Sequence, residues 1–220
     1  MARHAADGLG GSVAKRTINC PGWRTLIAKV PRSPPSPAAE EGTRLHESIA
    51  RWADVPPDLR SPCDEPKVKA ALEVADKQWP WDARLETLVE REVILPVPGA
   101  FGTADLLIVL EDRLVVADWK FGAGVRVEVE GNDQLLYYAA ASMHTYPRLR
   151  RPTVELAIIQ GDLSACTVPV EAVDIWLVRY RQALARNTFE RGDWCRWCPV
   201  GNAGQCPAPL DTEILGLLLT

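Results

Sequence analysis

The chain has 220 residues, 47% of them apolar and 25% charged, with a formal net charge of −4. These values are typical of one soluble globular domain with a sizeable core, and they exclude a protein that binds nucleic acid through net charge alone. No apolar run approaches the ~18 residues of a membrane span, and the first residues lack the apolar core of a signal peptide. We therefore expect a cytoplasmic protein without a membrane partner, in which cysteines are free, metal-bound or catalytic.

Helical and strand patterns alternate along the chain. The Gly/Ala-rich residues 1–15 are expected to be loose, and the proline-broken stretch 30–42 to form a loop. Periodicity then predicts helices over 40–53 and 67–78, a strand over 85–97, a hairpin over 103–120, a loop over 121–132, a helix over 132–146, strands over 153–160 and 166–170, a helix over 172–191, and a cysteine-rich tail with a short apolar helix. This order predicts a single α/β domain, residues 1–220, with a central mixed sheet flanked by helices.

The hairpin TADLLIVLEDRLVVADWK carries carboxylates at its ends. Asp105 is expected to begin the first strand and Asp118 to end the second, so that the two lie together at the open end, far from the turn. Two adjacent carboxylates can bind a hard cation such as Mg²⁺, and Lys120 faces the same side as Asp118, where it can orient water or stabilise charge on a phosphoryl oxygen. This outlines metal-assisted phosphodiester hydrolysis. The plainer interpretation is a surface aspartate–lysine pair, because D-x-K is a short and frequent motif.

Further polar residues accompany the hairpin. Gln134 and Tyr138 are four apart and share one face of a predicted helix, His46 lies on another helix, and Glu90 and Glu92 share one face of the preceding strand. Each has an ordinary structural explanation when taken alone: a core helix, an exposed histidine, and charges on a solvated strand face.

Taken together, these stretches resemble the RecB-type branch of the PD-(D/E)XK nuclease superfamily, and more narrowly a phage and prophage family of RecB-like nucleases. The matching pieces, from about residue 12 to residue 206, are AKRTINCPGW, GTRLHE, LVERE, FGTADLLIV, VVADWKFGAGVRVEVEGN and QLLYYAAA. The resemblance implies a restriction-endonuclease-like core and a DNA exonuclease that uses Mg²⁺ or Mn²⁺ in phage-type recombination or DNA processing. It also implies DNA as a partner, a recombination or single-strand annealing protein as a further one, and the host cytoplasm as location if a phage encodes the protein.

The resemblance assigns the metal-binding acids to Asp105 and Asp118, with His46 as an additional metal ligand. Lys120 matches the catalytic lysine. Glu90 matches a strand glutamate whose role in the family is less defined. Aspartate at position 118 replaces the commoner glutamate, and this shorter side chain still ligates a metal.

The resemblance also covers the helix that follows the hairpin. Gln134 and Tyr138 match the family's helix motif beside the active site. That motif positions substrate and supports the lysine, so both residues are expected to belong to the catalytic site.

Three of the six cysteines, Cys195, Cys198 and Cys206, form a C-x2-C-x7-C pattern, which is a strong metal-site signal that needs a fourth ligand. Cys20, in the turn-like stretch NCPGW, is the candidate. Four thiolates could hold Zn²⁺ or a 4Fe-4S cluster, and spacing alone favours zinc. The resemblance instead implies a 4Fe-4S cluster, while reduced cysteines packed as small hydrophobic side chains are the plain alternative.

A metal bound by these four residues would join residues 16–30 to residues 192–210 and close a very long loop, which makes it an efficient structural link. Cys63 and Cys166 are expected to be bystanders.

Two other functions stay open from the sequence. One is a non-catalytic DNA-binding or recombination-complex subunit on the same fold, against which the intact acids and lysine argue. The other is a zinc-stabilised scaffold with surface acids. DNA contacts are harder to place: arginines at 148–151 and along 179–191 either bind DNA or form a solvated face, and Trp194 and Trp197 either stack on bases or pack around the cysteines.

Overall fold

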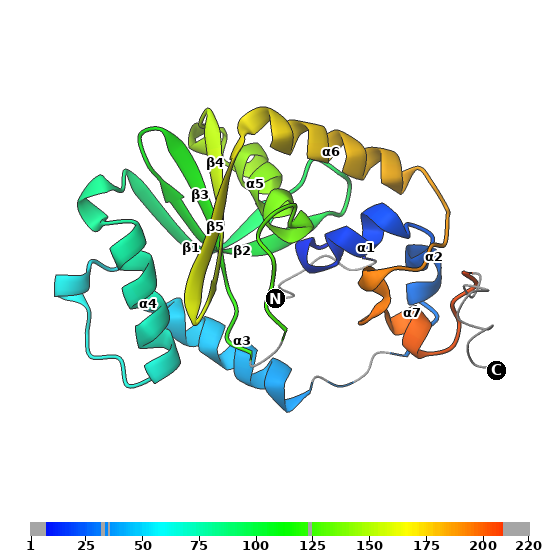
Figure 1. Ribbon diagram of the computed structural model, residues 1–220, viewed down its shortest axis with the longest axis horizontal. Coiled ribbons are helices and arrows are strands. Elements are labelled where there is room, and N and C mark those ends of the chain that lie inside the picture. The colour runs from blue at the N-terminus through cyan, green and yellow to red at the C-terminus, as the bar shows by residue number, and fades with distance from the viewer. Residues whose placement is uncertain (1–7, 32–33, 35, 123–124, 209–220) are drawn as a thin grey trace, which may run out of the picture.

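A computed structural model describes residues 8–31, 34, 36–122 and 125–208. Its centre is a five-stranded sheet in the order β1-β2-β3-β4-β5 (Figure 1). The strands are β1 (Glu86–Ile94), β2 (Phe101–Val109), β3 (Arg113–Trp119), β4 (Thr153–Gln160) and β5 (Asp162–Pro169). The β3–β4 pair is parallel and the other pairs are antiparallel, so the predicted mixed sheet is confirmed. No described helix combines the length and apolar character needed to cross a bilayer.

Helix α5 (Asp133–Thr145) makes the crossover that the parallel β3–β4 pair requires. Asn132 caps it, because its side-chain oxygen accepts hydrogen bonds from the backbone N–H groups of Gln134 and Leu135 at 3.0 and 3.1 Å. The helix predicted from residue 132 is therefore confirmed, and its alanine-rich middle is buried against the sheet.

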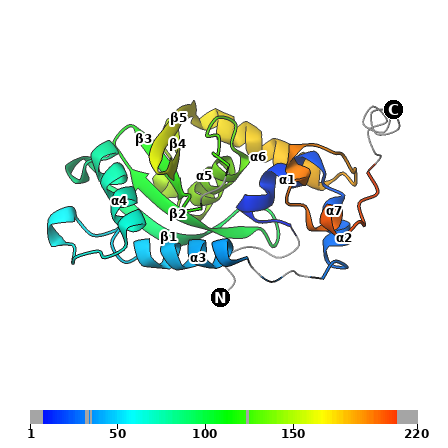
Figure 2. The same ribbon diagram turned by 60° about the horizontal axis from the view of Figure 1, so that its bottom comes forward.

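The sheet is covered on both faces (Figures 1 and 2). The first core cluster lies between the sheet and helices α1 (Ala14–Asn19), α5 and α6 (Val170–Leu184). The second core cluster lies between the opposite face and helices α3 (Pro37–Ile49) and α4 (Pro66–Gln78). Strand β3 supplies Leu114 and Val116 to the first cluster and Val115 and Ala117 to the second, which is why its sequence reads as an uninterrupted apolar run.

The remaining elements are short. Helices α2 (Trp23–Ile27) and α7 (Pro199–Asn202) lie together at one end of the molecule (Figure 1). Single 3-10 turns occur at Gly11–Val13, Pro57–Leu59, Trp81–Ala83, Pro147–Leu149 and Asp193–Cys195.

The structure corrects the expectation that residues 1–15 are loose. Residues 1–7 lie outside the described part, but from residue 8 onward the segment is ordered by packing. Leu9 and Ala14 are buried in the first core cluster, and Thr17 Oγ1 donates a hydrogen bond to the Gly8 carbonyl at 2.7 Å. The Gly/Ala composition allows a close approach to α5, because a Cβ on Gly11 would come within 2.9 Å of the Tyr138 ring.

Several element boundaries also differ from the sequence prediction. Helix α3 begins at Pro37, inside the predicted loop 30–42, because Ser36 caps it by accepting a hydrogen bond from Ala39 N and proline suits the first helical position. Helix α6 ends at Leu184 rather than at Arg191. Strand β5 begins four residues before the predicted 166–170, opposite β4. The apolar helix predicted at the C-terminus falls on residues 209–220, outside the described residues.

Candidate metal centre

The alternation of β1 side chains between the two faces of the sheet is interrupted at Glu90. Val89 packs in the second core cluster and Val93 in the first, although residues four apart on a regular strand share one face. The change coincides with a backbone φ of 48° at Glu90, a left-handed conformation that residues other than glycine rarely adopt. The kink leaves the Glu90 carboxylate at the boundary between the two layers of the fold.

The neighbouring strand changes face at the opposite position. On β2, Ala104 belongs to the first core cluster and Leu106 to the second, so alternation breaks at Asp105. Asp105 therefore lies within β2 and does not begin it, which corrects the sequence prediction. The β2–β3 register, with Leu106 opposite Ala117, still brings Asp105 beside Asp118 as predicted.

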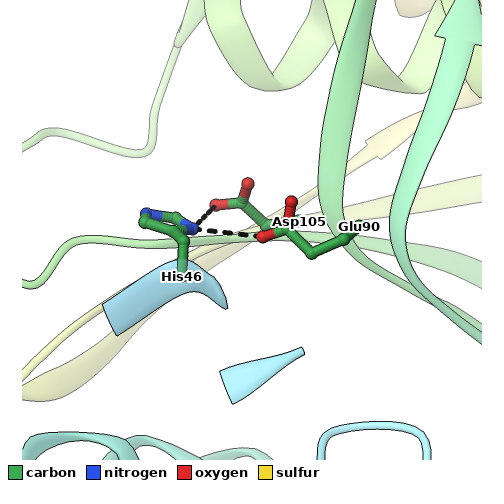
Figure 3. Close-up of side chains that lie close together, drawn as sticks. All are labelled: His46, Glu90 and Asp105. Carbon is green, nitrogen blue, oxygen red and sulfur yellow. Dashed lines mark hydrogen bonds and ion pairs between the residues drawn. The ribbon is translucent and has the colours of Figure 1, made fainter. Parts of the chain in front are cut away.

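His46 reaches this position from the last turn of α3. Its Nδ1 lies 3.3 Å from Glu90 Oε1 and 3.5 Å from Asp105 Oδ2 (Figure 3). Among the residues that the structure describes, this is the group whose candidate ligand atoms all lie within 4.8 Å of one another. Burial alone would lower the pKa of His46, but the Glu90 hydrogen bond and the charges of Asp105 and Glu90 outweigh it, so the pKa is raised.

Asp118, Lys120 and Gln134 form a second group on the side of α5. Lys120 Nζ lies 2.6 Å from Asp118 Oδ2 and donates a hydrogen bond to Gln134 Oε1 at 3.3 Å. Gln134 Nε2 donates to Asp118 Oδ1 at 2.7 Å, which closes the triangle. Burial lowers the pKa of Lys120, but the charge and hydrogen bond of Asp118 more than offset it. Lys120 is therefore an ammonium group at neutral pH.

The ring of Tyr138 lines the same site and is closely packed against two glycines, Gly11 and Gly102. A Cβ added at Gly102 would come within 3.0 Å of this ring. The pKa of the Tyr138 hydroxyl is raised well above its usual value, first by burial and then by the charges of Asp105 and Asp118. Tyr138 is thus a neutral phenol whose place is fixed by close packing.

His46 and Asp105 of the first group line one cavity of about 380 Å³ together with the second group, and Glu90 lies beside it. Burial, followed by the charge of Asp118, raises the pKa of the Asp105 carboxyl above its ordinary value. Anionic oxygens gathered this closely in a buried place are stabilised by a cation, and carboxylates with one imidazole are a donor set suited to Mn²⁺ or Mg²⁺. The residues present therefore fit a divalent metal.

All seven residues that the resemblance assigned to the catalytic site lie around this cavity or directly beside it. The sequence placed the metal on His46, Asp105 and Asp118, whereas the tightest group in the structure contains Glu90 in place of Asp118. Sequence reasoning missed Phe121, whose ring lies edge-on to His46 with centroids 5.4 Å apart. An aromatic residue directly after Lys120 was the available signal.

We expect His46→Ala to raise the metal concentration needed for half-maximal binding by about 10-fold or more, because a ligand atom is lost while the carboxylates remain. The measurement is a Mn²⁺ titration followed by calorimetry. His144→Ala is the matched control, since His144 is exposed on α5. Equal metal affinity in the two variants would remove His46 from the site.

The four predicted cluster cysteines lie in one subregion, formed by residues 16–30 and 192–208 and here called the cysteine region. Cys20 and Cys198 are buried there, and Cys206 packs against them. Cys20 Sγ accepts a hydrogen bond from Glu190 N at 3.4 Å, and the Cys195 thiol donates to the Glu190 carbonyl at 3.9 Å. Within the described part of the chain, their sulfurs form no group as tight as that around His46.

Arg16 is a cation that interacts with three of these cysteines. Its Nε donates to the Trp194 carbonyl at 3.1 Å, and its guanidinium lies over the Trp23 ring at 4.8 Å. Burial lowers the pKa of Arg16, and the charges of Cys198 and Cys195 act in the opposite direction. The two remaining cysteines, Cys63 and Cys166, lie elsewhere, before α4 and on β5 respectively.

Most arginines considered as DNA contacts are engaged within the fold. Arg148 and Arg150 form ion pairs with Glu86 and Asp174 at 2.6 and 2.5 Å. The others donate to backbone or side-chain oxygens elsewhere in the fold, such as the Pro96 carbonyl for Arg181 and the Ile18 carbonyl for Arg186. Of the two tryptophans, Trp194 packs in the cysteine region, while Trp197 is 74% exposed.

The fold and the site define an α/β protein with a five-stranded mixed central sheet and a cluster of carboxylates, a histidine and a lysine where its layers meet. The family model described as "Protein of unknown function (DUF2800)" matches residues 68–214, more than half of the chain, and the chain belongs to this family. A solved structure described as "Crystal structure of SSO0001" is similar at 12% identity over 90% of this chain and 86% of that one, with a TM-score of 0.42. Neither description names an activity.

Proposed function

We propose that this protein is a metal-dependent DNA nuclease of the RecB-like PD-(D/E)XK type, acting as an exonuclease in recombination or DNA processing. The observation that carries the proposal is the convergence of His46, Asp105, Asp118 and Lys120 on one cavity. Glu90 lies directly beside His46 and Asp105. Buried carboxylates next to a protonated lysine are suited to an anionic substrate only when a cation is bound between them.

In this proposal each side chain has a separate role in the reaction. His46, Asp105 and Asp118, with Glu90, would hold Mg²⁺ or Mn²⁺, which when bound activates water and offsets charge on the phosphate. Lys120 donates hydrogen bonds to the attacking water or to a phosphoryl oxygen. Because its pKa is raised, Lys120 is a hydrogen-bond donor and not a general base at neutral pH.

Gln134 is a positioning residue in this scheme, because it bonds to both Lys120 and Asp118. We expect Gln134→Ala to lower kcat by about 10- to 100-fold, the usual cost of removing a group that orients a metal or catalytic side chain. The Mn²⁺ concentration for half-maximal activity should change much less than kcat. Gln182→Ala, at an exposed position of α6, is the control, and equal kcat values in the two variants would contradict the role.

The test of the activity is digestion of end-labelled linear DNA and closed circular DNA with Mg²⁺, Mn²⁺ or EDTA. Shortening of linear DNA from its ends, with circular DNA intact and no reaction in EDTA, is the expected result. Cleavage of closed circular DNA would show that the protein is an endonuclease and not an exonuclease. Metal-independent DNA binding without any cleavage would instead support the non-catalytic subunit.

For the cysteine region, we propose that Cys20, Cys195, Cys198 and Cys206 hold a 4Fe-4S cluster with a structural role, with zinc as the alternative metal. What supports it is that Cys20 lies in one subregion with Cys195, Cys198 and Cys206, which are far from it in sequence, and that Arg16 lies close to them. A cluster held by four thiolates is anionic, and the partly buried guanidinium of Arg16 beside it would offset that charge.

A further inference from the structure

A second cavity adjoins the metal centre, between α4 and the C-terminal ends of β3 and β4. Its volume is about 350 Å³, within the ~300–1,000 Å³ typical of sites for small organic groups. Lys120 lines both cavities, and the ring of Phe121 lies between His46 and the second cavity. A group bound in the second cavity would therefore lie directly beside the scissile phosphate.

The lining combines apolar walls with two cations. Phe121, Ile159 and Ala71 form the apolar part, and Lys120 and Lys67 also line the cavity. The walls thus suit a flat, uncharged ring, and the lysines suit anions attached to it.

Lys67 is available for such an anion. Its ammonium group lies 2.7 Å from Glu41 on α3, and both side chains are about half exposed, at 53% and 49%. An ion pair this exposed contributes little to stability, so a phosphate can take the place of Glu41.

We propose that this cavity is a nucleobase subsite, in which one unpaired base beside the scissile phosphate stacks on Phe121 while Lys67 binds a flanking phosphate. The inference rests on the proposed nuclease function and deepens it by naming the substrate as single-stranded or frayed DNA. A base that is still paired and stacked in a duplex carries its partner with it and cannot enter a recess walled by α4 and the strand ends. Stacking on an aromatic ring holds any base, so the subsite is not specific for sequence.

The test is an abasic scan of a single-stranded 20-mer, in which one base at a time is removed and kcat/KM for cleavage is measured. In the wild-type protein, loss of the base that occupies the subsite should lower kcat/KM by roughly 5- to 150-fold, the range expected from stacking of one base. In Phe121→Leu that dependence should disappear at the same position, and in Phe121→Tyr it should persist.

This design separates substrate binding from a merely structural role of Phe121. If Phe121 only orients His46, Phe121→Leu lowers cleavage of every oligonucleotide by one factor, and the abasic profile stays that of the wild type. That result would overturn the subsite. Lys67→Ala should raise KM several-fold with kcat unchanged, whereas Lys69→Ala, exposed on the same helix, should change neither; equal KM values in the two would also count against the subsite.

The outcomes also distinguish this inference from the proposed function. If the wild-type protein cleaves no DNA with Mg²⁺ or Mn²⁺, the nuclease proposal fails and the subsite with it. If it cleaves and no abasic position depends on residue 121, the nuclease proposal stands and the subsite is wrong. Blunt duplex DNA cut as fast as single strands would equally contradict the subsite.

Discussion

Asp118→Asn and Lys120→Ala are each expected to reduce DNA cleavage by at least about 100-fold, and the fold should be retained in both. Loss of one preorganised group that stabilises transition-state charge costs ~10²–10³ in kcat. Asparagine has the volume of aspartate and can still accept the Gln134 hydrogen bond, but it cannot offer an anionic oxygen to a metal. Lys120→Ala removes the ammonium group that lies 2.6 Å from Asp118.

Asp112→Asn is the matched control for Asp118→Asn. Asp112 lies in the turn at the opposite end of the same hairpin and is 69% exposed. Its substitution should leave cleavage unchanged, and circular dichroism of all three variants should match that of the wild type. Full activity in Asp118→Asn or Lys120→Ala would refute the mechanism.

Cys20→Ser and Cys198→Ser are expected to abolish metal incorporation in the cysteine region. Protein purified without oxygen should be brown, with iron and acid-labile sulfide at about four each per chain, as in a four-cysteine cubane cluster. Closing a loop of about 175 residues contributes about 5 kcal/mol in the chain-entropy picture. Its loss corresponds to a fall of roughly 10–20 °C in the unfolding temperature of a chain of this size.

Cys63→Ser and Cys166→Ser are the controls, because these cysteines lie outside the cysteine region. They should leave colour and metal content unchanged. A content of one zinc per chain without sulfide would show that the four cysteines bind zinc and not an iron–sulfur cluster. Colour that survives Cys20→Ser would show that another residue is the fourth ligand.

The central strands β2, β3 and β4 could be predicted because they are buried on both faces. The continuous apolar runs of 106–110 and 114–117 fit central strands, and β4 has the predicted bounds, residues 153–160. Asn132 was a reliable start signal for α5, since a side chain that caps a helix acts locally. Local chemistry was sufficient in these cases.

Boundaries that depend on tertiary packing could not be predicted. Gly/Ala-rich residues 8–15 have no apolar periodicity of their own, and they are ordered only because Leu9 and Ala14 meet a core made by distant helices. The same holds for the kink of β1: nothing local to Glu90 indicates a φ of 48°, and it coincides with the change of face at Asp105 on the neighbouring strand.

The candidate site was predictable to the extent that its residues belong to recognisable motifs. Asp105, Asp118 and Lys120 follow from hairpin geometry, while His46 and Gln134 came from resemblance, because their proximity depends on how α3 and α5 pack. The second cavity and Arg16 gave no sequence signal, since both arise from surfaces of separate elements.

The most direct test of the central claim measures Mn²⁺ binding and DNA cleavage in the same samples, with electron paramagnetic resonance for free Mn²⁺ and end-labelled single-stranded DNA for cleavage. Bound Mn²⁺ and cleavage rate should rise together over one concentration range in the wild-type protein. Asp105→Asn should lose both, because it removes the carboxylate shared by the His46 group and the Asp118 side of the site. Cleavage that persists in Asp105→Asn at the wild-type Mn²⁺ concentration would contradict a metal-dependent nuclease centred on this site.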